Sequence, residues 1–201
     1  MNQSESEYER LSRELREANE RYNRLLEEKN FFESVAGADS LDAVIHLVLE
    51  YINRQWGFES FTVQLVDEEA KRLNYFTSYG VPLDDPDVLV AVTRNMQLDN
   101  KESISTYVAR KQKIYYATDI NPDVYTDISD VDLKALKTLN IKDNLILPVI
   151  YKSRTVGVIH MFTNTKALGL NAGQISLIQQ FVQSLAKVIE MEKRMQKLQK
   201  T

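Results

Sequence analysis

A heptad pattern over residues 4–36 constrains this chain more than any other feature of its sequence. Apolar or aromatic residues recur there at alternating spacings of three and four, Lys29 fills the one polar position, and charged residues cover the other faces. This spacing predicts a long α-helix with a narrow apolar seam, ended by Gly37. Because one helix cannot bury its own seam, we expect a parallel homodimer; packing back onto its own domain is the alternative. The seam consists of Tyr8, Leu11, Leu15, Ala18, Tyr22, Leu25 and Phe32.

Composition narrows the class of protein. Hydrophobic residues make up 43% of the chain, enough for a core, but no apolar run approaches the roughly 20 residues of a membrane span. The N-terminus MNQSESEYER lacks the apolar segment of a secretory signal. The net charge of -4 argues against nucleic acid as a partner. The absence of cysteine removes disulfides, cysteinyl zinc sites and thiol nucleophiles. We expect a cytoplasmic protein without membrane contact by this segment.

A second helix and a hairpin follow the heptad segment. A wide apolar face over residues 41–56 predicts a helix that packs on a sheet, with Asp39 or Ser40 as its N-cap and Gly57 as its end. From residue 60 the hydrophobic period changes from 3.6 to 2, which predicts two antiparallel strands joined by a polar turn. The two strands are residues 60–66 and 73–79.

The remaining residues alternate short helices with strands. Ser103 is the expected cap of one helix, in which Tyr107 and Val108 turn inward, and Pro148 marks its strand as an edge strand or a bulge. Local turns join both hairpins, which argues against a doubly wound parallel sheet. We expect an α+β fold with one antiparallel sheet and helices on both faces. The predicted elements are a loop over 80–86, irregular structure with a short extended piece over 87–101, helices over 103–113, 131–139 and 171–201, and strands over 114–120, 144–151 and 155–164.

Three stretches, in order, resemble the GAF domain family over about residues 38–192. The first is FTVQLVDEEAKRLNYFTSYG, a hairpin with an acidic turn and a final glycine. The second is SISTYVARKQKIYYATDI, which ends in the pair Asp119–Ile120, and the third is LILPVIYKSRTVGVIHMFTN, followed by an amphipathic helix. The resemblance implies a six-stranded antiparallel sheet, a small-molecule pocket beneath it, and a regulatory module rather than an enzyme.

This resemblance sets the expected domain organisation and function. Residues 1–37 form an N-terminal coiled-coil helix, 38–192 a GAF-like sensory domain, and 193–201 a C-terminal signalling extension, whose polar end suggests a fragment of a longer protein. We expect the helices to relay a small-molecule signal to an output domain in cis, a nucleotide cyclase (adenylate or guanylate) or a kinase. The alternative is a ligand-free dimerisation spacer, whose cavity is filled by the bulky side chains of Phe76, Tyr115, Tyr116 and Tyr125.

The ligand signatures of the family are mostly missing. Cyclic-nucleotide-binding GAF domains share an Asn–Lys…Phe…Asp–Glu signature, and this chain matches only Asn164. Lys166 lies beside the lysine position, and Leu170, Gln174 and Ile175 replace the rest. A cyclic nucleotide is therefore less favoured than another small molecule. Lack of cysteine excludes covalent bilins and methionine sulfoxide reduction. We expect a structural role for both histidines, His46 and His160, rather than haem ligation.

The resemblance places a pocket between the sheet and residues 103–140. In the first strand Thr62 and Gln64 alternate with Phe61, Val63 and Leu65, and we expect this polar row to face the pocket. No catalytic triad, phosphate loop or metal cluster is recognisable, and the aspartates of residues 119–132 lack the pattern of an EF-hand. The candidate pocket residues are Thr62, Gln64, Phe76, Ser78, Tyr116, Asp119, Tyr125 and Asn144.

Overall fold

The computed structural model describes residues 3–99, 103–124 and 129–199 and divides the chain into two units, Met1–Asp39 and Ser40–Thr201. The first unit is one helix, α1 (Gln3–Ala36), as the heptad pattern predicts. Its seam residues Leu11, Leu15 and Tyr22 are exposed in the single chain. The side chains of Tyr8, Leu25 and Phe32 lie outside those that the structure describes.

The second unit is built on a six-stranded antiparallel sheet with the order β3-β2-β1-β6-β5-β4. Both predicted hairpins form, β1 with β2 and β5 with β6, and β1 joins them through β6. This is the α+β fold that the sequence predicts. The strands are β1 (Ser60–Asp67), β2 (Arg72–Tyr79), β3 (Met96–Gln97), β4 (Tyr115–Ala117), β5 (Asp143–Tyr151) and β6 (Arg154–Thr163).

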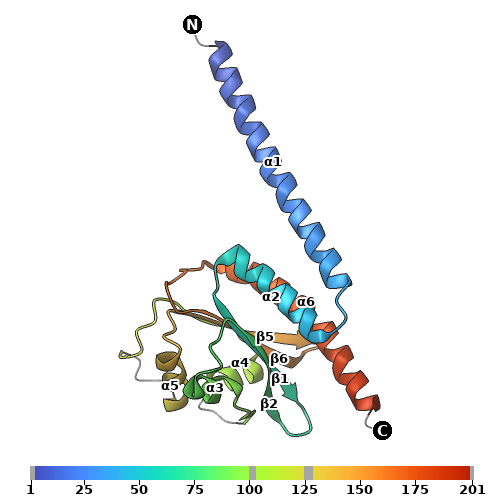
Figure 1. The fold of residues 1–201 in the computed structure, drawn as a ribbon, viewed down its shortest axis with the longest axis vertical. Coiled ribbons are helices and arrows are strands. Elements are labelled where there is room, and N and C mark those ends of the chain that lie inside the picture. Colours follow the sequence, from blue (N-terminus) through green and yellow to red (C-terminus); the bar gives the residue numbers. More distant parts are fainter. Residues whose placement is uncertain (1–2, 100–102, 125–128, 200–201) are drawn as a thin grey trace. The chain divides into compact units, whose positions relative to one another are not determined.

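Helices cover both faces of this sheet (Figure 1). Two long helices, α2 (Leu41–Trp56) and α6 (Ala172–Gln199), pack on one face, and three short ones lie on the other. The Ser40 hydroxyl accepts a hydrogen bond from the Ala43 amide, and Gly57 ends α2 with a left-handed φ of 82°, so the cap and stop were predicted correctly. The short helices are α3 (Pro86–Thr93), α4 (Ile104–Lys111) and α5 (Asp130–Thr138).

The hydrophobic core has a layer on each side of the sheet. Between the sheet and α2 and α6, Phe61 contacts the His46 ring edge to face, and Phe181 packs against Tyr51 and Trp56. On the other side, one cluster gathers Val66, Leu73, Met96, Val108, Ala109, Ile146 and Val158. A second cluster gathers Ile120, Leu136, Ile141 and Phe162.

Helix α3 is the largest difference from the predicted elements, because irregular structure was expected over 87–101. Asp85 caps this helix by accepting hydrogen bonds from the Asp87 and Val88 amides, and Pro86 occupies its first turn. The short extended piece predicted in the same segment is β3.

Two details of α4 also differ, whereas β5 has the irregularity that was the second alternative predicted for Pro148. Ser103 stands at the N-cap position of α4, but its hydroxyl donates to the Met96 sulfur instead of capping the helix. Val108 is buried as expected, whereas Tyr107 is exposed. Strand β5 is not an edge strand, because β4 and β6 pair with its two sides. The pairing with β4 extends only to Ile146, so β4 has no residue opposite Pro148. The register of the β5–β6 pair also shifts next to this proline, between Val149 and Ile150.

Candidate functional site

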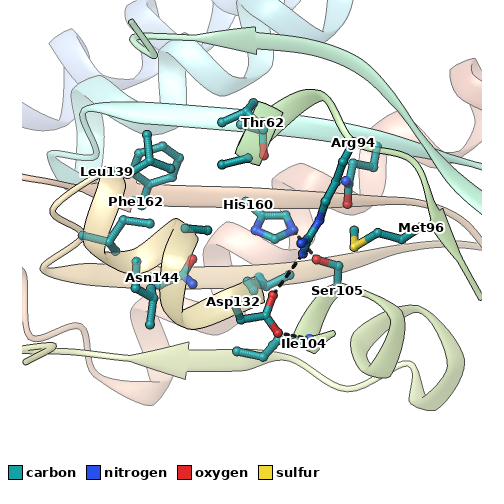
Figure 2. A pocket seen from close by; sticks show the side chains of 17 residues that line it. Thr62, Arg94, Met96, Ile104, Ser105, Asp132, Leu139, Asn144, His160 and Phe162 are labelled. Atoms are coloured by element: carbon teal, nitrogen blue, oxygen red, sulfur yellow. Dashed lines mark hydrogen bonds and ion pairs between the residues drawn. The ribbon is translucent and has the colours of Figure 1, made fainter. Parts of the chain in front are cut away.

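A cavity of about 70 Å³, here called the sheet cavity, lies between the sheet and the segments that carry α3, α4 and α5 (Figure 2). Its floor is one face of strands β1, β6 and β5. Its roof comes from the short helices and the residues beside them. The floor residues are Thr62, Gln64, Asn144, Ile146, His160 and Phe162. The roof residues are Ala91, Val92, Arg94, Met96, Ile104, Ser105, Asp132, Ala135, Leu136, Leu139 and Ile141.

Strand register places the polar floor residues on the same face. Thr62 pairs with His160, and His160 pairs with Ile146, so these residues form one row across β1, β6 and β5. Asn144 pairs with Phe162 in the next row. The period of two along each strand keeps all of them on the cavity side.

His160 lies at the centre of this floor, between Arg94 and Asn144 (Figure 2). Its Nε2 is 2.9 Å from the Ser105 hydroxyl. Burial, together with the positive charge of Arg94, lowers the pKa of His160 from 6.5 to about 4. The imidazole is therefore neutral at physiological pH.

Asp132 holds the roof together. Its carboxylate accepts hydrogen bonds from Arg94 at 3.4 Å, from the Ile104 amide at 2.9 Å and from the Ser129 hydroxyl at 3.1 Å. The Asp132 amide in turn donates to the Ser129 hydroxyl, which completes a reciprocal cap for α5. Burial raises the pKa of Asp132 despite these bonds, and burial lowers the pKa of Arg94. One carboxylate thus links α5, the start of α4 and the segment after α3.

Two amide side chains of the floor have an oxygen that accepts no hydrogen bond within the described part of the chain. Gln64 and Asn144 are buried, and neither Gln64 Oε1 nor Asn144 Oδ1 accepts a hydrogen bond from any described residue. A buried polar atom without a partner costs free energy unless a water or a ligand supplies one. Both atoms belong to side chains that line the sheet cavity.

Three of the eight candidate residues, Thr62, Gln64 and Asn144, line the sheet cavity. The Ser78 hydroxyl instead shares a hydrogen bond with the Tyr75 hydroxyl, and Phe76 lines a different groove beside α6. Tyr116 and Asp119 do not line the cavity either, since both bind the buried carboxylate of Asp143. Tyr125 lies outside the described residues.

Asp143 explains the place of Tyr116 and Asp119. This fully buried carboxylate accepts five hydrogen bonds from described residues, three of them from the segment around β4 and two from the residues before α6. The donors are the hydroxyls of Tyr116 (2.8 Å) and Thr118 (2.7 Å) and the amides of Asp119 (3.2 Å), Leu168 (2.8 Å) and Gly169 (3.3 Å). Burial is the main cause that raises the pKa of Tyr116, and the Asp143 carboxylate adds to it.

Arg94, Ser105 and Asp132 were not among the predicted cavity residues, and His160 was expected to have a structural role. The position of Arg94 follows from α3, which was not predicted. Asp132 carried a usable signal, because Ser129 three residues earlier gives the spacing of a capping box. Nothing in the local sequence of Ser105 indicates that it faces a histidine 55 residues away.

A second groove, here called the α6 groove, has a volume of about 490 Å³ and lies between the β1–β2 hairpin and the C-terminal half of α6. Ion pairs cross it. Arg154 pairs with Glu68 and with Glu190, the latter at 2.7 Å. Arg194 binds the same Glu190 at 2.9 Å. Lys197 binds Glu69 at 2.9 Å. Burial acts to raise the pKa of Glu190, but the two arginines outweigh it and lower this pKa. The network therefore ties both hairpins to α6.

The chain belongs to the GAF domain family, whose model matches residues 38–190. GAF domains are regulatory sensory modules found in sensor kinases and other signalling proteins. No curated protein matches the chain. Over the described residues, no helix has the length and hydropathy to span a membrane, and no group of acidic or histidine side chains there is arranged to hold a metal ion.

Solved structures support the same fold. The GAF domain of an Acinetobacter phosphoenolpyruvate-protein phosphotransferase has a TM-score of 0.62 at 16% identity, over 85% of this chain and 95% of its own. A GAF/HD domain protein from Geobacter sulfurreducens has a TM-score of 0.61 at 19% identity, over 79% of this chain and 97% of its own. The GAF domain of a two-component sensor histidine kinase from Bacillus halodurans has a TM-score of 0.60 at 17% identity, over 78% of this chain and 97% of its own. At these identities the likeness concerns the fold alone.

Proposed function

We propose that this chain is a regulatory, non-catalytic, cytoplasmic module that senses a small molecule in the sheet cavity and relays the signal through dimeric terminal helices. The observation that carries the proposal is the sheet cavity itself. Its floor belongs to the central strands, its roof is three segments held by one carboxylate, and two of its buried oxygens have no described partner. The output domain, a nucleotide cyclase or a kinase, is proposed to follow in cis.

The size of the cavity bears on the ligand. Pockets for drug-sized ligands measure about 300–1,000 Å³, whereas the sheet cavity measures about 70 Å³. The ligand is therefore compact, which argues against a cyclic nucleotide. The alternative of a ligand-free spacer is weakened, because Phe76 and Tyr116 do not line the cavity, although Tyr115 packs against the core cluster beside it. The small volume remains in its favour.

A route from cavity to exit helix supports the relay. Strands β1 and β6 carry Thr62, Gln64 and His160 in the cavity floor. At the far ends of the same strands lie Glu68, just after β1, and Arg154, the first residue of β6, which belong to the α6 groove network. Glu190 on α6 is a buried partner of that network. A ligand that favours one arrangement of the floor strands would thus bias the position of α6.

A thermal-shift screen tests the sensing step. Compact polar metabolites should raise the melting temperature by several degrees at about 100 times their Kd, since such saturation adds about 2.7 kcal/mol. Cyclic nucleotides should not. Hydrogen exchange in α6 should change with the same ligand. If nothing in the screen stabilises the domain, the sensing step is wrong and the spacer reading stands.

Exposed apolar residues on both terminal helices support the dimer. On α6, Leu177, Met191, Met195 and Leu198 are exposed, with heptad spacing, on a helix whose other face is buried by the domain. On α1, Leu11, Leu15 and Tyr22 are exposed in the same way. Two such stripes are the surfaces that a second copy would cover.

We expect light scattering to give a dimer at tens of micromolar protein, and deletion of residues 1–36 should weaken it. Leu15→Glu places a charge in the seam and should weaken dimerisation about tenfold or more, because it removes two leucines from the interface. Arg16→Glu, on a different face, is the matched control and should leave the dimer intact. A monomeric full chain would refute this part of the proposal.

A further inference from the structure

The roof of the sheet cavity contains an ion pair, Arg94–Asp132, whose arginine has N–H groups that donate to no other described residue. Arg94 and Asp132 are largely buried, with 27% and 12% of their side chains exposed, and Nη2 of Arg94 is 3.4 Å from the carboxylate. A guanidinium carries five N–H donors in a fork that fits a carboxylate with two parallel bonds. Among described residues, Arg94 donates only this one long bond. Its geometry is suited to a better acceptor.

Charge balance restricts the net charge of a ligand that could carry this acceptor. Arg94 and Asp132 cancel each other, and His160 is neutral because its pKa is about 4. Glu and Lys side chains do not line the cavity among the described residues. A ligand with a net charge would therefore add an uncompensated buried charge, which is costly. A molecule with one charge of each sign adds none.

The volume of the sheet cavity restricts the ligand further. A water molecule needs about 10–15 Å³ of such space, so the sheet cavity of about 70 Å³ holds roughly five waters or a molecule of similar size. Its walls include apolar groups such as Val92, Leu136 and Ile146 beside the polar ones. A compact molecule with two adjacent opposite charges and a small apolar group matches this inventory.

We propose that the sheet cavity binds a compact zwitterion of the α-amino acid class, with its carboxylate on Arg94 and its ammonium group on Asp132. This inference rests on the proposed sensing function and names the ligand class for it. One long ion pair is replaced by two charge-assisted contacts, each between a ligand group and one protein side chain. The oxygens of Gln64 and Asn144 remain as acceptors for further ammonium hydrogens or for a water that enters with the ligand.

Binding of this kind would reorganise the roof. Asp132 also accepts from the Ile104 amide at the start of α4, and Arg94 follows α3 directly (Figure 2). A zwitterion between the two side chains would connect these segments through itself instead of through the direct 3.4 Å bond. The position of α3 relative to α4 and α5 would then differ between the empty and the ligand-bound cavity.

Calorimetric titration of the whole chain with alanine tests the inference. Alanine should bind, and propionate and ethylamine, each of which lacks one of the two charges, should bind at least tenfold more weakly, because each loses one charge-assisted contact. Arg94→Gln and Asp132→Asn should each weaken alanine binding by a similar factor. Lys134→Gln is the matched control, since Lys134 joins the same two helices through an exposed pair with Asp87 and should leave the affinity unchanged.

The possible results separate the two proposals. The ligand series uses the unaltered chain, so it remains informative even if a roof variant fails to fold. No binding of alanine, glycine or serine at millimolar concentration, or equal binding of propionate, overturns the zwitterion class. If another small molecule still stabilises the domain in the thermal-shift screen, sensing survives with a different ligand. If nothing binds in either experiment, both proposals fail.

Discussion

Replacing Asp143 by alanine should cost the domain about 4 kcal/mol, a large part of the roughly 5–15 kcal/mol by which an ordinary domain is stable. The carboxylate is fully buried at the start of β5 and accepts five hydrogen bonds from described residues, three of them shorter than 2.9 Å. Its removal leaves two hydroxyls and three amides without their acceptor around a fully buried position, although the donor residues themselves are half-buried or exposed. Each unsatisfied buried donor costs about 1–3 kcal/mol before water or local rearrangement relieves part of the loss.

The effect should spread beyond β5, because Asp143 joins two segments that are distant in sequence. Thr118 and Asp119 follow β4, and Leu168 and Gly169 precede α6. The Tyr116 hydroxyl, which donates to Asp143, also accepts from the Leu170 amide at 2.7 Å. Loss of the carboxylate should therefore loosen the entry to α6, which native-state hydrogen exchange would detect as faster exchange around residues 168–175.

Urea unfolding with two comparison variants checks this prediction. Tyr116→Phe removes one of the five donors together with its bond to Leu170, so it should cost about 1–2 kcal/mol. Asp67→Ala removes another hydrogen-bonded aspartate, the half-buried last residue of β1, and should cost less than about 1 kcal/mol. An Asp143→Ala variant within 1 kcal/mol of the unaltered chain would contradict the role assigned to this carboxylate.

Strongly periodic segments were predictable from sequence, and Asp143 shows where such prediction stops. The heptad of α1, the wide face of α2, the alternation of β1 and the apolar run of β6 were each recognisable in the sequence, and all four elements form as predicted. Alternation also put Thr62 and Gln64 on the correct face. It does not show whether a polar side chain such as Tyr116 faces a ligand or a carboxylate 27 residues further along the chain.

Helix α3 and the roof were missed for a related reason. The sequence PDVLVAVT is short and apolar on nearly every side, so it has no helical period, and only the cap Asp85 and Pro86 marked its start. Without α3, Arg94 had no defined position. Its partner Asp132 is 38 residues away, and their meeting depends on how α3 packs against α5. The charged part of the candidate site is thus a product of tertiary packing rather than of any local motif.

Lowering the pH from about 6.5 to 4 should destabilise the domain through His160. The pKa of this imidazole is about 4 in the folded chain, because burial and the charge of Arg94 disfavour its protonated form, against 6.5 when unfolded. Between these values the unfolded chain binds a proton that the folded chain does not, so stability rises with pH across this window. The full difference corresponds to about 3 kcal/mol, present above pH 6.5 and lost as the pH approaches 4.

A pH series of urea unfolding with three variants isolates this contribution. His160→Gln should flatten the stability curve between pH 6.5 and 4.5, whereas His46→Gln, which keeps His160, should retain its slope. Asp132 acts in the opposite sense, because burial raises its pKa and the folded chain therefore takes up that proton first. Asp132→Asn should thus steepen the loss of stability on acidification. Equal slopes in the unaltered chain and His160→Gln would show that His160 is not the neutral, desolvated floor of the cavity that the structure describes.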